Sequence, residues 1–449
     1  MTGAALADPP LVGAITVGGE RLLQQRCDRE SFAEYRAAGG YRNAVRGAGV
    51  LRELSVAGLR GRGGAAFPTA IKWQAVAERP GPRHVVVNAE EGEPASAKDR
   101  WLLRHRPHIV VEGALAAASA IGADTIWIYV ADRPAAESAR EAAAELRADT
   151  SLGPIPRINV VEVPHTYVAG EETSVVRAID GGPALPTTKP PRPFERGAAG
   201  SPTLVQNAET LAHVALIVRS GAKQFRGAGS NTAPGTLLLT ISGDCIRPGL
   251  VEVATGTRLR EVLALAGGVR GGGAPAGFAF GGYFGGIAGP RTVDLPIEHD
   301  ALRTEGIGLG CGAVIVLGTH RCVVAVAATI GKFFAAQSAH QCGVCVRGTA
   351  AIQGALERLR GGRADPANVE QLQRFAGLVR GRGACALPDG AANVVESLIR
   401  EFPGTVADHV GRVCLRCRLP VDDVIPNLAA RPVTSGARPE ETRSREESQ

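Results

Sequence analysis

The stretch His84 to Pro94, HVVVNAEEGEP, begins with apolar residues and ends in an amide and three carboxylates. A short apolar run that stops at polar residues is typical of a buried strand in a parallel sheet. Downstream, helical patterns at Val111 to Ile121 and Ala135 to Arg147 alternate with strand patterns at Thr125 to Val130 and Ile158 to Val163. This β-α-β-α-β order predicts an α/β domain in which helices cover the faces of a parallel sheet.

Polar side chains follow two of these strands. Asn88, Glu90, Glu91 and Glu93 come after the first strand, and Tyr167 follows the third. Parallel sheets bind ligands beyond the carboxyl ends of their strands, so these residues are candidates for a site. Taken alone, the acidic loop is better explained as a solvated surface. An amide beside carboxylates also binds the hydroxyl groups of a ribityl or ribose unit, and carboxylates there disfavour an extra 2′-phosphate.

Upstream, Gly58 to Thr69, GLRGRGGAAFPT, is a glycine-rich loop with two arginines. Successive backbone N–H groups in such a loop, followed by the start of a helix, can cradle a phosphate, and Arg adds charge-assisted hydrogen bonds. Many loops of this kind are only tight turns. The predicted helix start at Thr69 to Trp73, which carries Lys72, favours a ligand here.

Two more polar loops open helices. Tyr167 to Thr173, YVAGEET, joins a strand to a helix, and Val205 to Thr210, VQNAET, opens the next helix. Acids in a first helical turn suit the helix dipole, and the amides could equally be helix caps. Four such loops together nevertheless favour one shared ligand site more strongly than any loop does alone.

The composition indicates a water-exposed multidomain protein. The chain has 449 residues, 45% hydrophobic and 21% charged, which suggests roughly two to four domains. A net charge of +6 spread along the chain and 4% aromatic residues argue against a nucleic-acid surface. There is no long uninterrupted apolar run and no signal-peptide order, so we expect a cytoplasmic protein without a membrane span. Nine cysteines without a secretion signal favour reduced thiols available to metal.

The pattern changes after a long Pro/Gly/Thr-rich loop at residues 182–201. Strands at Leu237 to Ile241, Gly249 to Val253 and Ala313 to Leu317 flank a helix at Thr257 to Ala266, with Thr257 as its cap. This order predicts a small α+β, ubiquitin-like module.

From Val324 onward the chain is nearly all helical, which predicts a helical bundle. The expected helices lie near 324–338, 346–360, 366–380 and 390–402. Both ends, Met1 to Pro10 and Thr434 to Gln449, have the composition of disordered tails.

A cysteine cluster lies in this helical region. Gln337 to Gly348, QSAHQCGVCVRG, contains Cys342 and Cys345, and Cys385 follows downstream. This spacing is typical of a metal or iron–sulfur site. A C-x-x-C-x-x-C run would place a further cysteine at position 339, which is Ala339, and His340 stands beside it.

The remaining cysteines are less specific. Cys414 and Cys417 form a second C-x-x-C, which fits a redox pair, half of a metal site or two free thiols. Cys311 and Cys322 flank an apolar strand and are expected to be small core residues. Cys27 and Cys245 show no partner pattern.

These loops and cysteines, in this order, resemble the FMN-bearing flavoprotein subunit of respiratory NADH dehydrogenase (the F-type subunit of complex I), over about residues 35 to 425. The resemblance rests on the following motifs: GLRGRGGAAFPTAIKW at 58–73, NAEEGEPASAKDR at 88–100, AGEET at 169–173, KPPRP at 189–193, NAETL at 207–211 and GLGCGAVIVL at 308–317. It implies an α/β FMN- and NADH-binding domain at 35–225, a β-grasp (soluble-ligand-binding, SLBB-like) α+β domain at 235–320 and a four-helix iron–sulfur bundle at 324–428. Residues 1–34 would then be an N-terminal extension and 434–449 a disordered tail.

The resemblance also implies roles for individual residues. Those similar to FMN contacts are Gly61, Arg62, Gly63, Lys72, Asn88, Glu90, Glu91, Tyr167, Gly170, Glu171, Glu172, Gln206, Asn207 and Thr210. Phe67, Glu93, Glu172 and Lys189 fall where the family holds NADH. Cys342, Cys345 and Cys385 resemble ligands of a [4Fe–4S] cluster, with His340 as a candidate for the fourth position. A degenerate cluster, a cluster completed by Cys414 or Cys417, and a lost cluster remain alternatives.

The implied reaction is a hydride transfer from NADH to FMN, followed by single-electron transfer to the cluster. The cofactors carry this chemistry, so no side chain is expected to act as a catalytic acid or base, and Glu93 and Glu172 would position NADH. The implied partner is a small thioredoxin-like [2Fe–2S] subunit or a ferredoxin, and the protein could belong to a larger complex on the cytoplasmic side of a membrane.

The chain departs from the family pattern at the nucleotide site as well. Ala75 and Arg192 stand where the family has aromatic residues, which predicts weaker or altered NADH binding. An accessory flavin-binding subunit or relay with impaired NADH oxidation is therefore the alternative function. A ligand-sensing or assembly protein is a third.

Overall fold

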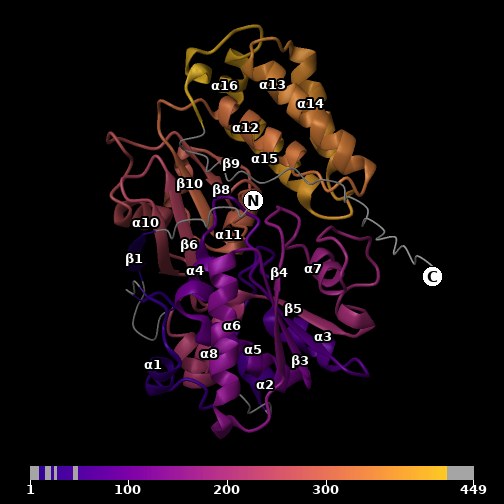
Figure 1. The fold of residues 1–449 in the computed structure, drawn as a ribbon. Helices are drawn as coiled ribbons and strands as arrows, with labels where there is room; N and C mark the ends of the chain where they lie inside the picture. The colour runs from indigo at the N-terminus through magenta and orange to yellow at the C-terminus, as the bar shows by residue number, and fades with distance from the viewer. Residues whose placement is uncertain (1–9, 16–21, 25–27, 44–48, 422–449) are drawn as a thin grey trace, which may run out of the picture.

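The computed structural model describes residues 10–15, 22–24, 28–43 and 49–421 (Figure 1). The disorder expected at 1–10 and 434–449 falls outside these residues, except for Pro10, and so does Cys27. In Figure 1 the α/β region fills the lower half, a second sheet lies above it, and the C-terminal helices form the top.

A four-stranded sheet organises the α/β region. Its strand order is β4-β3-β2-β5, and every pairing is parallel. The strands are β2 (His84–Asn88), β3 (Thr125–Val130), β4 (Arg157–Glu162) and β5 (Thr203–Asn207). The register sets Asn88 opposite both Tyr129 and Asn207, so these residues share the carboxyl edge of the sheet. The parallel α/β arrangement predicted from the sequence is confirmed, and β5 is an additional strand.

Helices cover this sheet, and their Ala-rich sequences allow close packing. They are α1 (Phe32–Ala37), α2 (Val50–Ala57), α3 (Thr69–Ala77), α4 (Lys98–His105), α5 (Pro107–Ile121), α6 (Arg133–Ala148), α7 (Glu172–Ile179), α8 (Ala208–Ser220) and α9 (Ala222–Phe225). Helix α5 is buried along almost its whole length and packs against α8. A Cβ at Gly113 of α5 would lie 1.9 Å from the carbonyl oxygen of Leu211, so this crossing requires glycine.

The second sheet is mixed and six-stranded, with the order β1-β7-β6-β10-β8-β9. Its strands are β1 (Leu11–Ile15), β6 (Thr236–Gly243), β7 (Gly249–Ala254), β8 (Gly277–Phe280), β9 (Ile287–Ala288) and β10 (Ala313–Leu317). Helices α10 (Leu259–Leu265) and α11 (His299–Thr304) accompany it. The cap predicted at Thr257 is wrong. Arg258 is the N-cap residue of α10, because the Thr257 hydroxyl instead donates back to the Ala254 carbonyl at 2.7 Å.

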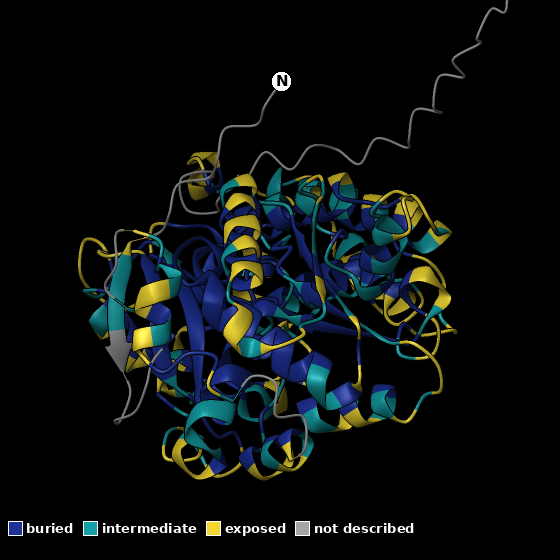
Figure 2. Cartoon of the chain, turned by 60° about the horizontal axis from the view of Figure 1, so that its bottom comes forward, coloured by how far each residue is buried: buried dark blue, intermediate teal, exposed yellow. Residues whose placement is uncertain are grey.

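The C-terminal region is helical, as predicted. It contains α12 (Val323–Ala336), a π-helical turn at Val344–Gly348, α13 (Thr349–Arg360), α14 (Pro366–Val379), α15 (Leu387–Glu401) and α16 (Pro403–Asp408). Figure 2 shows most strands in dark blue, although residues 11–13 of β1 are half-buried and β4 is mostly half-buried or exposed, while exposed residues gather on the outer faces of peripheral helices. Within the described residues, no helix combines the length and apolarity that crossing a membrane requires.

Candidate functional site

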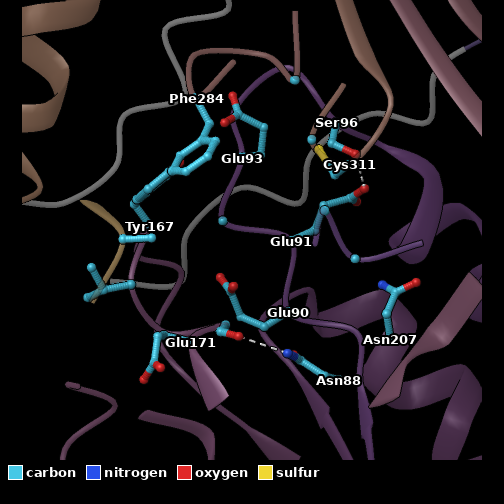
Figure 3. A pocket seen from close by; sticks show the side chains of 18 of the residues that line it. Asn88, Glu90, Glu91, Glu93, Ser96, Tyr167, Glu171, Asn207, Phe284 and Cys311 are labelled. Atoms are coloured by element: carbon cyan, nitrogen blue, oxygen red, sulfur yellow. Dashed lines mark hydrogen bonds between the residues drawn. The ribbon is translucent and has the colours of Figure 1, made fainter. Parts of the chain in front are cut away.

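A cavity of about 380 Å³ opens at the carboxyl edge of the four-stranded sheet (Figure 3). This volume lies in the range of small-molecule and cofactor sites. Its walls come from the glycine-rich loop, the loops after β2 and β4, the second sheet and the loop before α15. The lining residues are Gly63, Gly64, Ala65, Asn88, Glu90, Glu91, Gly92, Glu93, Ser96, Asp99, Tyr167, Val168, Gly170, Glu171, Asn207, Gly281, Phe284, Gly310, Cys311, Cys385, Ala386 and Leu387.

Glycines keep the cavity open. Gly170 faces Glu90, and a Cβ at position 170 would lie 2.6 Å from Glu90 Oε2. Gly64 has φ of +118°, a backbone conformation that L side chains rarely adopt. The glycines of two loops therefore leave space and exposed backbone where a ligand can approach closely.

Asn88 and Glu90 present unpaired polar atoms at this edge. Asn88 Nδ2 donates to the Gly170 carbonyl at 2.8 Å, while Asn88 Oδ1 has no hydrogen-bond partner within the described chain. Both Glu90 carboxylate oxygens are buried without a hydrogen bond there, although His165 Nδ1 lies 3.4 Å from Glu90 Oε1 as an ion-pair contact. Burial raises the pKa of Glu90, and the interaction with His165 only partly offsets that rise. Buried polar atoms without partners are costly, so these groups are suited to receiving a polar ligand.

Glu91 and Asp99 line the same cavity but also take part in a buried network. Ser96 Oγ donates to Glu91 Oε1 at 2.6 Å, and Lys98 Nζ lies 2.8 Å from Asp99 Oδ2. Burial raises the pKa of Asp99 to about 6, even though the Lys98 ammonium opposes that shift. Asn207 Nδ2 donates to Asp99 Oδ2 at 2.7 Å, which links β5 to this network.

Glu93 joins the α/β region to the second sheet. Its Oε1 accepts a hydrogen bond from the Tyr283 backbone N–H at 3.0 Å. Burial of the carboxylate dominates over this bond and raises the pKa of Glu93 to about 8. Cys311, on the same wall, is half-buried, and desolvation raises the pKa of its thiol to about 12. Cys311 is thus a cavity residue in addition to a packed one.

Four of the predicted contacts point elsewhere. The Arg62 guanidinium is buried and donates to the carbonyls of Pro234 and Thr236 at 3.4 and 3.2 Å. Lys72 Nζ donates to the Val205 carbonyl at 2.6 Å. The Thr210 hydroxyl accepts the Arg62 backbone N–H at 2.8 Å, and Gln206 Oε1 accepts from Trp73 Nε1 at 3.3 Å. These four side chains connect the glycine-rich loop to neighbouring segments and do not line the cavity. Gly61 does not line the cavity either, and its backbone N–H donates to the Phe67 carbonyl.

Two of the four residues expected to hold NADH, Glu172 and Lys189, lie at the start of α7 or contact it. Glu171 caps that helix by accepting the backbone N–H of Thr173 at 2.8 Å, which is the structural role considered for it in the sequence. Lys189 Nζ lies 2.5 Å from Glu171 Oε1 and 3.6 Å from Glu172 Oε1. Arg192 Nη1 lies 3.7 Å from Glu172 Oε1, so Glu172 faces two cations. Phe67 is 51% exposed and does not line the cavity.

One of the predicted cluster cysteines forms part of the far wall of the cavity, and the other two do not line it. Cys345 is buried in the π-helical turn, Cys342 is half-buried, and Cys385 precedes α15 and lines the cavity itself. The pKa of Cys385 is raised to about 11, mainly by burial and to a smaller degree by the neighbouring Cys345 and Cys342. The three thiols come from two segments, that of Cys385 interacts electrostatically with the other two, and thiolates are the usual ligands of an iron–sulfur cluster.

The position opened by Ala339 has two polar neighbours. Ser338 is buried, and its Oγ lies 2.9 Å from Cys345 Sγ. His340 is exposed and has φ of +53°. Cys414 and Cys417 do not approach this site; their sulfurs gather with Cys322 and His409 instead.

Tyr167 connects the cavity to the cysteine-bearing helices. Its ring packs edge-to-face on Phe333 and Phe334 of α12, with centroids 5.5 and 5.4 Å away. Its backbone N–H donates to Gln337 Oε1 at 3.0 Å, at the start of the cysteine loop. Tyr167 therefore contacts both the cavity and the segment that leads into the cysteine loop.

Sequence reasoning missed several wall residues from distant segments. Gly281 and Phe284 follow β8, while Gly310 precedes β10, and the Gly281 and Gly310 backbones nearly touch: a Cβ at Gly310 would lie 2.7 Å from Gly281 Cα. Both glycines have positive φ angles, +57° and +55°, which are typical of glycine in turns. The local richness in glycine was therefore the only sequence signal that could have indicated these turns.

The donor set fits an FMN. Glycine backbones provide a close approach, and the unpaired oxygens of Asn88 and Glu90 provide acceptors for ribityl hydroxyl groups. A sheet-edge cavity of this kind beside a thiol cluster defines a flavin-binding electron-transfer protein.

Comparisons with known proteins agree. Residues 54–216 match the family model of the Nuo51 FMN-binding domain, and residues 325–409 match the NADH-ubiquinone oxidoreductase-F iron-sulfur binding region. An F subunit of the NADH-quinone oxidoreductase of Rhizobium meliloti is 32% identical over 400 residues, which cover 85% of this chain and 95% of that protein. The F subunit of the Rickettsia felis enzyme is 34% identical over 80% of this chain and 88% of its own length. The chain belongs to the family of NADH-quinone oxidoreductase F subunits.

Solved structures support the same assignment. An NAD⁺-reducing [NiFe]-hydrogenase in its H₂-reduced state superimposes with a TM-score of 0.76 at 30% identity, covering 85% of this chain and 67% of that one. Its air-oxidised state gives 0.79 at 28% identity, covering 94% and 72%.

Proposed function

We propose that this chain is an NADH-dependent flavoprotein dehydrogenase that delivers electrons through an iron–sulfur cluster to a partner protein. The observation that carries this proposal is the shared wall: the cavity that begins at Asn88 and Glu90 ends at Cys385. When bound, FMN accepts a hydride from NADH and releases the electrons one at a time. The residues of the chain would position FMN and NADH, exclude water from them and set the local electrostatic field.

Asn88 and Glu90 would hold the flavin's hydroxyl-bearing chain beside Asn207, while the backbone of Gly63 to Ala65 would contact its phosphate or ring. Arg62 and Lys72 would act from behind this loop by holding it in place, since both donate to backbone carbonyls. Glu171 and Glu172 would lie at the nucleotide side, with Lys189 balancing their charge.

We also propose domain boundaries, which are supported by the two family matches at 54–216 and 325–409. We take 35–225 as the FMN- and NADH-binding domain, 235–320 as a β-grasp domain and 324–428 as the four-helix iron–sulfur domain. Cys342, Cys345 and Cys385 would bind the cluster, with His340 as the fourth ligand and Ser338 as an oxygen-bearing competitor for that position. The partner would be a small thioredoxin-like [2Fe–2S] subunit or a ferredoxin within a larger complex.

A second function is favoured by the ion pairs at the nucleotide side. Arg192 and Lys189 both face Glu172, and Arg192 replaces an aromatic residue of the family pattern. A flavin-binding relay with weak NADH oxidation would follow if these pairs hold Glu172 away from the nucleotide. The same substitution predicts that NADH binds less tightly than in ordinary family members.

One experiment separates these functions. The protein is purified anaerobically with FMN and iron, and its absorption and electron paramagnetic resonance spectra are recorded before and after NADH is added. Bleaching of the flavin band together with a reduced-cluster signal supports the dehydrogenase. Bound flavin that only dithionite bleaches supports the relay, and a protein that never retains FMN contradicts both.

A further inference from the structure

Four potential metal ligands meet at the opposite end of α12 from the cysteine loop. Cys322 immediately precedes α12, and His409 follows α16. Cys414 precedes the 3-10 turn Leu415–Arg418, and Cys417 lies within that turn. Their ligand atoms all lie within 4.8 Å of one another. His409 is the last residue of the iron–sulfur family match, and the three cysteines lie outside it.

We propose that Cys322, His409, Cys414 and Cys417 bind one structural Zn²⁺ in a tetrahedral Cys₃His site. Cys322 Sγ lies 3.2 Å from His409 Nε2 and 3.3 Å from Cys417 Sγ, and His409 Nε2 lies 3.3 Å from Cys417 Sγ. Zinc–sulfur bonds of about 2.3 Å and zinc–nitrogen bonds of about 2.0 Å at tetrahedral angles separate ligand atoms by roughly 3.5 Å. The ligand atoms of Cys322, His409 and Cys417 therefore need to move apart by only about half an ångström or less to accept the ion, and Cys414 Sγ lies within 4.8 Å of each of them.

The imidazole already has the orientation of a zinc ligand. His409 Nδ1 lies 2.7 Å from the Thr405 carbonyl oxygen, which can only accept a hydrogen bond. The proton of the neutral ring therefore belongs on Nδ1, and the Nε2 lone pair points at the sulfurs. Metal-bound histidines commonly use their second nitrogen in this way.

The site is closed, which favours a structural ion over a catalytic one. Cys322, His409 and Cys417 are buried, and Cys414 is half-buried. Four protein ligands leave no position for water or substrate, as in zinc sites that stabilise folds.

Two other interpretations fit the distances less well. A disulfide requires sulfurs about 2.0 Å apart, whereas the Cys322 and Cys417 sulfurs are 3.3 Å apart and both cysteines are free. An iron–sulfur cluster would place its own atoms between the ligands and hold the thiolates farther apart than ligands that share one ion. The cysteines proposed for the cluster form no such close group among the described residues, in contrast to this one.

Zinc would anchor a segment that packing holds poorly. Val413, Leu415 and Leu419 are 58%, 76% and 43% exposed, so burial contributes little around the C-x-x-C turn. One hydrogen bond that connects this segment to the start of α12 runs from Arg321 Nη1 to the Pro420 carbonyl at 2.7 Å. The other end of α12 leads into the loop with Cys342, so an ion at Cys322 would brace the helix that supports the cluster.

The test is metal analysis of the full-length protein, purified without added chelator, with iron and zinc measured separately. We expect about one zinc per chain, retained through desalting. Growth with cobalt should give the visible d–d and thiolate charge-transfer bands of tetrahedral Co²⁺. Cys417→Ser should lower zinc at least about five-fold, while Cys245→Ser, at a buried cysteine outside the group, should retain it.

The wild-type protein alone can overturn the proposal, so a variant that fails to fold does not weaken the test. Iron-loaded protein with less than about 0.1 zinc per chain and no cobalt bands would contradict it. A Cys322–Cys417 disulfide detected by mass spectrometry would contradict it too, as would equal zinc in both variants. None of these measurements depends on FMN or NADH, so a negative result would contradict the zinc site without bearing on the proposed enzyme activity.

Discussion

Asn88 and Asn207 are register partners at the carboxyl ends of the neighbouring strands β2 and β5, and both line the cavity. Their roles differ. The Asn207 amide is engaged with Asp99, whereas Asn88 Oδ1 has no partner within the described chain. Asn88 is therefore the amide that is available to a ligand.

Asn88→Ala should weaken FMN binding about 10- to 100-fold, because an acceptor for the ligand and the support of the Gly170 carbonyl are both lost. The measurement is a flavin-fluorescence titration of apoprotein. Asn43→Ala is the matched control, since Asn43 Nδ2 also donates to a backbone carbonyl, that of Val218 at 3.3 Å, but does not line the cavity. Equal FMN affinities of the two variants would contradict the assignment.

Gly170→Ala should lower the amount of bound FMN, because the new methyl group would lie 2.6 Å from Glu90 Oε2 and push that carboxylate into the cavity. We expect less than about half of the wild-type flavin after desalting, a loss consistent with displacement of a buried charged group. Gly404→Ala serves as the control, because a Cβ there meets nothing within 4 Å. Full flavin occupancy in Gly170→Ala would show that the ligand does not use this wall.

The parallel sheet and the C-terminal helices were predictable because their signals are local. Apolar runs such as His84 to Asn88 and long helical periodicities read directly from neighbouring residues. Strand β5 was missed because Gln206 and Asn207 make its end polar, so the segment resembles a helix start. Thr is a common cap residue, but the Thr257 hydroxyl donates to the Ala254 carbonyl and does not cap α10.

The site was harder to predict because its walls come from distant segments. Nothing near Cys322 in sequence reveals that its sulfur meets Cys417, 95 residues away. The expectation that Cys322 is a buried residue is confirmed, but burial alone did not reveal its neighbours. Arg62 and Lys72 likewise carry charges suited to a phosphate, and only the fold shows that both reach backbone carbonyls.

The pKa of Glu93 should make stability depend on pH. Burial raises it from 4.5 to about 8, so the folded chain binds this proton more tightly than the unfolded chain does. The stabilisation is complete below pH 4.5 and disappears as the pH rises through about 8. Between about pH 5 and about pH 9, the melting temperature of FMN-free protein should fall more for the wild type than for Glu93→Gln, by a difference on the order of 5 °C. Glu137→Gln, on the exposed face of α6, should follow the wild type; parallel curves for all three proteins would refute the assignment.

Arg192→Phe should strengthen NADH binding. The substitution removes the cation 3.7 Å from Glu172 Oε1 and supplies a ring that can stack on adenine. An aromatic contact of this kind contributes about 0.5–1.5 kcal/mol, so KM for NADH in a ferricyanide assay should fall about 2- to 10-fold. Arg192→Ala removes the ion pair without adding a ring and separates the two effects. An unchanged or higher KM in Arg192→Phe would mean that adenine does not bind beside this residue.

Ala339→Cys should increase cluster content, because Ala339 is 3% exposed at the position where the first cysteine of the C-x-x-C-x-x-C run would stand. A fourth thiolate should raise iron toward about four per chain and slow cluster loss in air.

If His340 is the natural fourth ligand, His340→Ala should convert the oxidised protein to the paramagnetic three-iron form, and Ala339→Cys should rescue that variant. Ser338→Ala should instead leave the iron content unchanged and shift the reduction potential, because it removes a hydroxyl 2.9 Å from Cys345 Sγ. Loss of iron in Ser338→Ala but not in His340→Ala would mean that the Ser338 hydroxyl, and not the His340 imidazole, is the fourth ligand. The control for the added thiol of Ala339→Cys is Ala336→Cys, at the exposed end of α12.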